Sequence, residues 1–146
     1  MIYLDSAYIA RCYLPEPGHA EVTALIASNP RIISIALARI EVASVFHRKL
    51  REGAITLSIH RELCLQFAED IAAGIWSFLP VTDPLLQRAQ FAYQGLPPTV
   101  FLRFADCLHL CAATEAGVKE IYSDDRHVLA AAPHFKLKGI DVTHGV

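Results

Sequence analysis

Short apolar runs alternate along the chain with longer stretches in which apolar residues recur at helical spacing. Short apolar, β-branched runs are typical of buried strands, and apolar residues three or four positions apart are typical of helices that cover a core. The pattern predicts strands over residues 1–5, 31–35, 75–81, 120–123 and 139–142. It predicts helices over residues 6–14, 19–27, 37–52, 58–74, 83–93, 100–116 and 125–132.

Residues that favour helix ends set several of these boundaries. Ser58 is expected to cap the fourth helix, and Asp83 followed by Pro84 is a favourable N-cap and first-turn pair for the fifth. Thr99 is expected to cap the sixth helix, which Gly117 would end. These boundaries leave only short loops between the elements.

Strands that alternate with helices favour a parallel sheet, because parallel neighbours need a crossover connection that a helix usually provides. We therefore expect an α/β protein, an α/β/α sandwich with a short, mostly parallel central sheet. The length of 146 residues suits one domain over residues 1–146. In such sheets ligands bind at the carboxyl ends of the strands, so functional residues are expected there.

The composition excludes some classes of protein. The chain is 53% hydrophobic and 19% charged, with a net charge of -2, which is typical neither of a disordered chain nor of a strongly basic nucleic-acid binder. Any nucleic acid would have to be bound through a local patch or through a metal ion. We find no signal-peptide pattern and no apolar run that approaches the ~20 residues of a membrane span, so we expect a cytoplasmic protein.

The cysteines are expected to be free thiols, because they lie at apolar positions without a CxxC pair. Cys107, His109 and Cys111 raise the question of a zinc site, as do His60 and Cys64. Helical spacing places Cys107 and Cys111 on one face and His109 away from it, which disfavours zinc.

Carboxylates at the ends of two predicted strands are the first candidate functional groups. Asp5 ends the first strand, and Asp124 and Asp125 follow the strand over 120–123. Both places should lie at the carboxyl edge of the sheet. The alternative is that these residues simply cap the helices that follow, which is a common role for Asp.

Two further carboxylates lie beside apolar stripes of predicted helices. Glu41 is flanked by core-facing positions in the third helix, and Asp106 lies within the apolar stripe of the sixth. Ordinary ion pairs are the alternative explanation: Arg39 or Arg48 for Glu41, and Arg103 for Asp106.

The four positions together suggest a metal site. Carboxylates that converge on one spot repel one another, and a divalent cation relieves the repulsion. Because the ligands would be oxygens, a hard ion such as Mg²⁺ or Mn²⁺ is expected, and such loose sites suit phosphate chemistry.

Several segments, in this order along the chain, resemble the PIN-domain family and more narrowly its bacterial VapC-like toxins. They are MIYLDS, ARIEVAS, LRFADCLHLCAA, YSDDRHVLAAA and GIDV. The resemblance implies an acidic quartet formed by Asp5, Glu41, Asp106 and Asp125. Of these, it assigns the metal ion to Asp5, Asp106 and Asp125. It gives auxiliary places to Ser6, Ser123, Asp124 and Arg126, with Asp124 able to share the role of Asp125. His109 belongs to the same helix motif, and we interpret it as a core histidine whose hydrogen bonds are satisfied.

The resemblance also implies an activity and partners. It predicts a Mg²⁺- or Mn²⁺-dependent endoribonuclease that is the toxin of a toxin–antitoxin pair, with RNA as substrate, a cognate antitoxin and a homodimer. Cations for the RNA backbone are candidates at Arg11, Arg39, Arg48, Lys49, Arg51 and Arg126. The apolar residues Tyr8, Ile9, Cys12, Tyr13, Leu14 and those within 50–67 would serve protein interfaces, or else the core.

Two other functions stay open from the sequence. A phosphotransfer enzyme also places acids at strand ends, but Ala7 stands where the haloacid-dehalogenase pattern requires a second Asp. A non-catalytic binding module could use the acidic pocket to bind an arginine of a partner protein.

Overall fold

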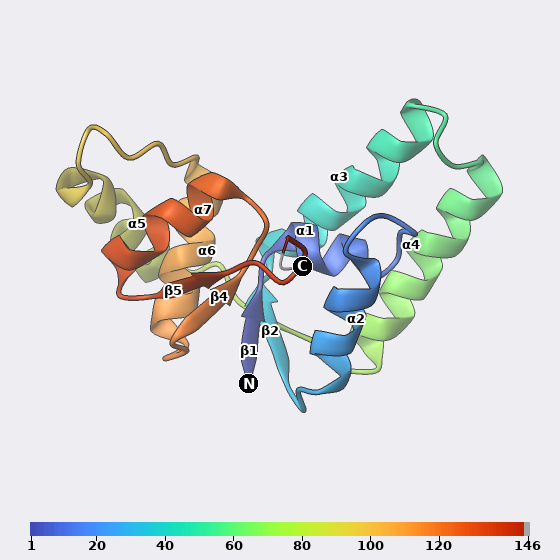
Figure 1. Cartoon of the computed structure of the whole chain (residues 1–146), viewed down its shortest axis with the longest axis horizontal. Coiled ribbons are helices and arrows are strands. Elements are labelled where there is room, and N and C mark those ends of the chain that lie inside the picture. Colours follow the sequence, from blue (N-terminus) through green and yellow to red (C-terminus); the bar gives the residue numbers. More distant parts are fainter. Residues whose placement is uncertain (145–146) are drawn as a thin grey trace.

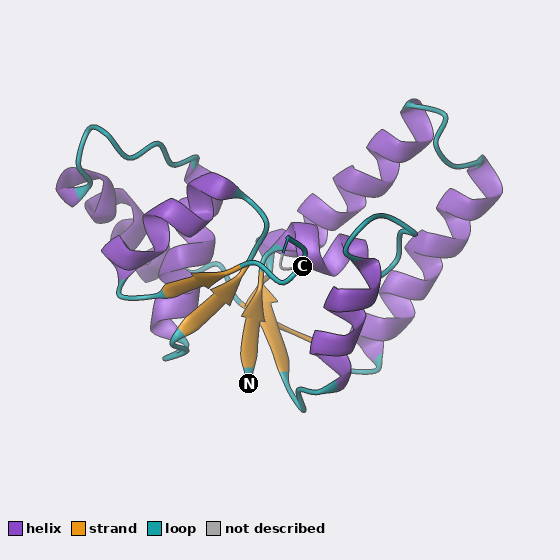
Figure 2. Cartoon of the chain, viewed as in Figure 1, coloured by secondary structure: helices purple, strands orange, loops and turns teal. Residues whose placement is uncertain are grey.

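In a computed structural model, which describes residues 1–144, the chain forms a five-stranded sheet whose strands are all parallel (Figure 2). The strand order is β3-β2-β1-β4-β5. The strands are β1 (Ile2–Leu4), β2 (Ile32–Ile35), β3 (Trp76–Leu79), β4 (Glu120–Tyr122) and β5 (Lys138–Ile140). The predicted parallel sheet is confirmed, with strands somewhat shorter than the apolar runs that indicated them.

Helices cover both faces of this sheet (Figure 1). On one side lie α1 (Ser6–Arg11), α2 (His19–Ala27), α3 (Leu37–Arg51) and α4 (Leu57–Ala72). On the other lie α5 (Asp83–Gly95), α6 (Phe104–Glu115) and α7 (Arg126–Ala131), with the short 3₁₀ helix η1 (Ala132–Phe135). The α/β/α sandwich is therefore confirmed.

The two hydrophobic cores follow from the alternation of side chains along the strands. Tyr3 packs into the core on the α5–α6 side, whereas its neighbours Ile2 and Leu4 pack into the core on the α1–α4 side. Successive residues of a strand point to opposite faces, so a strand buried on both sides is apolar throughout. This accounts for the unbroken apolar run at the start of the chain.

The order of the strands creates a switch point at β1. The chain proceeds from β1 to β2 and β3 on one side, and then returns to β4 on the other side of β1. Leu4 pairs with Tyr122 in the register, and the N–H of Asp5 donates to the carbonyl of Tyr122 over 3.1 Å. Residues that follow β1 and β4 are therefore neighbours at the edge where ligands bind in such sheets.

The N-caps of α4 and α5 differ from the predicted ones. Thr56, not Ser58, caps α4, and Thr82, not Asp83, caps α5. Each threonine has an extended backbone, and its hydroxyl accepts a hydrogen bond from the N–H three residues on, over 3.2 Å. Ser58 and Asp83 already lie inside their helices, where a side chain cannot perform this role.

The start of α6 also differs from the prediction. Thr99 does not cap it, because the helix begins only at Phe104, with Arg103 in the N-cap position. The N–H of Val100 donates to the carbonyl of Pro97, which makes a turn in the segment before the helix. The side chain of Arg103 makes no capping bond and extends to other partners.

The segment after β5 packs against α1 and completes the core there. The hydroxyl of Tyr8 donates to Oδ1 of Asp141 over 2.9 Å and accepts from the N–H of Val142 at the same distance. Gly18 lies so close that an added Cβ would stand 2.7 Å from a methyl group of Thr143. Tyr8 and Ile9 are fully buried as a result. Of the two roles left open for these apolar residues, the core is the correct one for Tyr8, Ile9 and the buried Leu14.

Tyr13 likewise serves the interior. Its hydroxyl donates to Oδ2 of Asp70 over 2.6 Å and accepts from the indole N–H of Trp76 at the same distance.

Among the described residues, no helix is both long enough and apolar enough to cross a membrane.

Candidate active site

Asp5 lies at the end of β1 and caps α1. Its Oδ1 accepts a hydrogen bond from the N–H of Tyr8 over 2.9 Å, so the capping role anticipated from the sequence is present. The residue is 6% exposed. Burial raises the pKa of its carboxyl to about 6, although hydrogen bonds from Ser123 and Tyr8 oppose the increase. Asp5 is thus a buried acid that is costly to ionise.

The residues that follow β4 are held in a tight turn beside Asp5. Ser123 is fully buried, and its hydroxyl accepts from the N–H of Asp125 over 3.0 Å. Asp125 caps α7 through Oδ1, which accepts from the N–H groups of His127 and Val128 at 2.7 and 3.4 Å. Its second oxygen, Oδ2, takes no part in the cap and accepts a hydrogen bond from Arg103 instead.

Arg103 joins two of the predicted site carboxylates. Its Nε donates to Oδ2 of Asp106 over 2.8 Å, and its Nη2 donates to Oδ2 of Asp125 over 2.9 Å. Asp106 is buried, whereas the Arg103 side chain is 60% exposed. The two carboxylates, Asp106 first, raise the pKa of Arg103 above its ordinary value. The ion pair considered for Asp106 on sequence grounds is confirmed.

Glu41 has a partner that the sequence did not reveal. Its Oε1 lies 2.7 Å from Nε2 of His109, on α6. The alternative of an ion pair with Arg39 or Arg48 is wrong: within residues 1–144 the ion-pair partner of Glu41 is His109, and Arg48 lies 3.9 Å from Glu52.

His109 is fully enclosed by partners from two other elements. It is 2% exposed, and its Nδ1 lies 2.9 Å from the hydroxyl of Tyr3 in β1. With Glu41 at Nε2, both ring nitrogens have partners, which confirms the interpretation of His109 as a satisfied core histidine. Tyr3 was missed as a site neighbour. Its place on β1, directly before the strand end that carries Asp5, was the available signal.

The remaining predicted residues lie around the same edge. Asp124 accepts from Nη2 of Arg11 over 2.6 Å, which turns it toward α1. Ser6 is the half-buried first residue of α1, and Arg126 is the exposed first residue of α7. This half-buried ion pair shows that Arg11 is not a free cation for RNA, contrary to its inclusion among the candidates.

These contacts gather the predicted acids in one neighbourhood. Asp5 is linked through Ser123 to Asp125, and Asp125 through Arg103 to Asp106. Glu41 contacts His109, which lies one turn after Asp106 on α6, so the fourth acid is placed beside the same helix. The four acids come from the ends of β1 and β4 and from α3 and α6.

A model of the PIN domain family matches residues 2–133. The chain belongs to the PIN domain family. The match covers all of the elements that carry the acidic residues, which agrees with the resemblance seen in the sequence. It gives no support to the phosphotransfer alternative.

Solved structures share the fold of this PIN domain. VapC20 from Mycobacterium tuberculosis, described as a sarcin-ricin loop cleaving toxin, is 16% identical, with a TM-score of 0.72 over 90% of this chain and 95% of VapC20. FitAcB from Neisseria gonorrhoeae is 15% identical, with a TM-score of 0.70 over 99% of this chain and 100% of that one. FitAB bound to an IR36 DNA fragment is 16% identical, with a TM-score of 0.65 over 100% of this chain and 98% of that one. The chain has no match among curated protein sequences.

Two of the acids predicted to hold a metal ion in this PIN domain are engaged in ion pairs. Within residues 1–144, no group of three or more His, Cys, Asp or Glu side chains is arranged to hold a metal ion. Asp106 and Asp125 are instead bridged by Arg103. None of the ion pairs found in the same part of the chain includes Asp5, and its raised pKa marks a buried acid that a cation would stabilise. The donor set, made of carboxylate oxygens, is of the kind that a hard divalent ion prefers.

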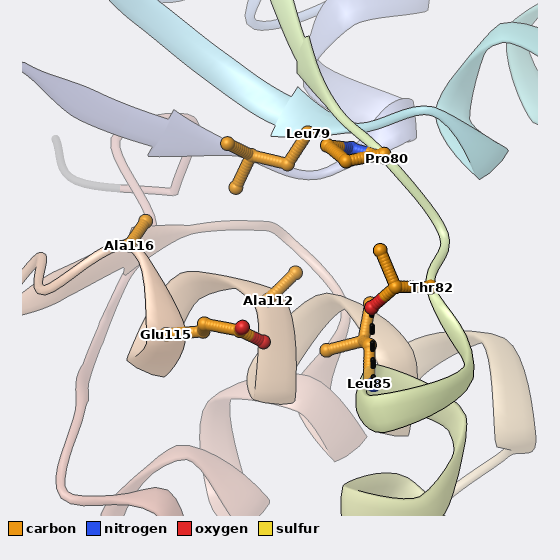
Figure 3. Close-up of a pocket in the computed structure, with 7 residues that line it drawn as sticks. All are labelled: Leu79, Pro80, Thr82, Leu85, Ala112, Glu115 and Ala116. Atoms are coloured by element: carbon orange, nitrogen blue, oxygen red, sulfur yellow. Dashed lines mark hydrogen bonds between the residues drawn. The ribbon is translucent and has the colours of Figure 1, made fainter.

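A separate small cavity of about 140 Å³ lies away from these acids, between the end of β3 and the helices α5 and α6 (Figure 3). Leu79, Leu85 and Ala112 contribute apolar walls, and Glu115 supplies the carboxylate on its lining. The hydroxyl of Thr82 on its wall is occupied in capping α5. Its lining on α6 lies beyond the first turn that carries Asp106, so the cavity is not part of the acidic site.

Proposed function

We propose that this PIN domain is a metal-dependent endoribonuclease that acts in the cytoplasm as the VapC-like toxin of a toxin–antitoxin pair. The observation that carries the proposal is the gathering of Asp5, Glu41, Asp106 and Asp125 from four elements at one edge of the sheet. Membership of the PIN family and the VapC20 toxin among the proteins of similar fold support it.

Asp5, Asp106 and Asp125 would hold Mg²⁺ or Mn²⁺, and Glu41 would complete the acidic pocket. When bound, the ion would lower the pKa of a water that attacks the scissile phosphate and would offset charge on the phosphoryl oxygens. Asp5 is fixed by its capping bond, and Asp125 is fixed by the two N–H groups of α7. These bonds orient the carboxylates before any ligand arrives, which reduces the cost of ordering them.

The RNA would be single-stranded or in a loop, where bases and backbone are accessible. Among the cations predicted to contact its backbone, four have exposed side chains: Arg39, Arg48, Arg51 and Arg126. Lys49 is paired with Glu16, so it is less available than its position suggested. Phosphate contacts of this kind make binding sensitive to salt.

An antitoxin and a second copy of the chain are the proposed protein partners. The hairpin of α3 and α4 keeps large apolar side chains exposed, which supports the expectation that part of residues 50–67 forms an interface. They are Leu57, Ile59 and Leu65 within that range, with Ile40 on the preceding helix.

The test is cleavage of a panel of structured and single-stranded RNAs by the purified chain without antitoxin. We expect cleavage with Mn²⁺ or Mg²⁺ that EDTA abolishes, with a 5′-phosphate and a 3′-hydroxyl on the products. The variant Asp5→Asn should be inactive while keeping its fold. Cleavage that persists in EDTA and in the variant would show contamination rather than this activity.

A non-catalytic binding module is the second candidate. It is favoured by one observation, that the acids accept a guanidinium: Arg103 already bridges Asp106 and Asp125. An arginine of a partner protein could take the same place. A chain that binds a partner tightly but cleaves no RNA with any metal would support this function instead.

A further inference from the structure

A buried chain of hydrogen bonds connects the interior of the sheet to one of the site carboxylates. It runs from the hydroxyl of Tyr3 to Nδ1 of His109 over 2.9 Å, and from Nε2 of His109 to Oε1 of Glu41 over 2.7 Å. The three residues come from β1, α6 and α3, and they are 106 and 68 positions apart in sequence. Such a chain is formed only when the whole fold is assembled.

The direction of the donors follows from the chemistry of the groups. An ionised carboxylate can only accept hydrogen bonds, so the contact requires a proton on Nε2 of His109. In the neutral ring Nδ1 is then an acceptor, which the phenol of Tyr3 satisfies as donor. Burial raises the pKa of Tyr3 well above its ordinary value, although Ser34 opposes the increase, so the phenol keeps its proton.

Packing fixes the imidazole as well as the hydrogen bonds do. Tyr3 is fully buried, and its ring meets that of His109 edge to face, with centroids 5.9 Å apart and planes at 87°. Glu41, by contrast, lies at the surface with a side chain that is 25% exposed. Within residues 1–144, the carboxylate of Glu41 has one side-chain hydrogen-bond partner, which is His109. A glutamate without this partner would populate several rotamers, and ordering it for the reaction would cost conformational entropy.

We propose that His109 is a positioning residue, which Tyr3 holds in place so that its Nε2–H fixes the carboxylate of Glu41 for the reaction. This inference rests on the proposed nuclease function. Asp106 lies one turn before His109 on α6, so both residues are on the same side of this helix. The helix therefore carries one site acid, Asp106, and the residue that holds another, Glu41.

The test compares variants of the full chain in RNA cleavage at saturating Mn²⁺. His109→Leu keeps the volume but removes the donor, and we expect it to lower kcat about 10- to 100-fold with little change in KM, as loss of a residue that orients a site ligand does. His109→Gln keeps an N–H near the position of Nε2, and we expect it to restore kcat to within about threefold of wild type. Leu110→Val, at a buried neighbour on α6, should leave kcat unchanged and controls for loosened packing.

A double-mutant cycle separates positioning from a general loss of structure. If His109 acts only through Glu41, adding His109→Leu to Glu41→Gln should change kcat by less than about threefold. If the two losses multiply, or if folded His109→Leu keeps the wild-type kcat, the positioning role is overturned. Thermal unfolding of each variant shows that it is folded at the assay temperature.

A second measurement needs no activity. In ¹⁵N-histidine-labelled protein, the NMR signals of His109 should show a protonated Nε2, and Glu41→Gln should shift that signal. An Nε2 signal that does not respond to Glu41→Gln would overturn the proposal. If the wild type cleaves no RNA but the signal responds, the nuclease function fails while the contact stands.

Discussion

Replacing Arg103 with Gln is expected to strengthen metal binding. In the free protein Arg103 bridges Asp106 and Asp125 through bonds of 2.8 and 2.9 Å, and its side chain is 60% exposed. A metal ion that uses both carboxylates must displace this bridge. The energy of the bridge is therefore subtracted from the binding energy of the ion in the wild type, but not in Arg103→Gln.

The magnitude follows from the exposure of the pair. Ion pairs screened by solvent are worth ~0.2–1 kcal/mol each, so the two contacts together contribute about 1 kcal/mol. Since 1.4 kcal/mol is tenfold in affinity, Arg103→Gln should bind Mn²⁺ about fivefold more tightly. In the absence of metal the same variant should be less stable by about 1 kcal/mol.

Isothermal titration of Mn²⁺ into metal-free proteins at neutral pH measures the effect. Arg126→Gln is the matched control, because it removes an exposed positive charge next to Asp125 in sequence but leaves the bridge intact. Its affinity should change by less than about twofold, as expected for a screened surface charge. Equal affinities for wild type and Arg103→Gln, or an equal gain in the control, would refute displacement of the bridge.

Three further predictions concern stability. Thr56→Ala should lower the free energy of unfolding by about 1 kcal/mol in urea denaturation because it removes the N-cap of α4, whereas an equal loss in Ser58→Ala would contradict the assigned cap. Phe46→Ala should cost ~3–5 kcal/mol because its ring is fully buried, and a similarly small loss in Phe46→Ala and in the exposed Phe91→Ala would contradict the core. Burial alone would raise the pKa of Asp141, but its surrounding hydrogen bonds hold it at about 2. The stabilisation that the ionised Asp141 gives the fold is therefore complete above the unfolded pKa of ~3.9 and lost as pH falls toward 2. The free energy of unfolding of Asp141→Asn should depend less on pH in this acid range than that of wild type. An equal pH dependence in the two proteins would refute this.

The sequence was most informative where the pattern is local. A buried strand can be recognised from a short apolar run such as the one around Tyr3. The acids after the first and fourth strands can be placed because ligands bind at the carboxyl ends of parallel strands in general. These two patterns were sufficient to place Asp5 and Asp125 at the same edge of the sheet.

Contacts between distant segments were harder to predict. The sequence offered nearby arginines as partners for Glu41, but the true partner, His109, lies 68 positions away on a helix that covers the opposite face of the sheet. Likewise the sequence left Tyr8 open between an interface and the core, since the segment that covers it follows the last strand, 133 positions away. For Asp106 the local partner, Arg103, was the correct one, since one helical turn brings the two together.

The most direct test of the proposed active site is the rate of RNA cleavage by Asp106→Asn at saturating Mn²⁺. This change keeps the size of the buried side chain but removes its charge. Asp83→Asn, at an exposed position on α5, is the control. Cleavage slowed about 100-fold or more in Asp106→Asn alone is the predicted result, because the carboxylate would be a direct ligand of the ion. If folded Asp106→Asn cleaves as fast as wild type, the acids at this edge of the sheet are not the active site.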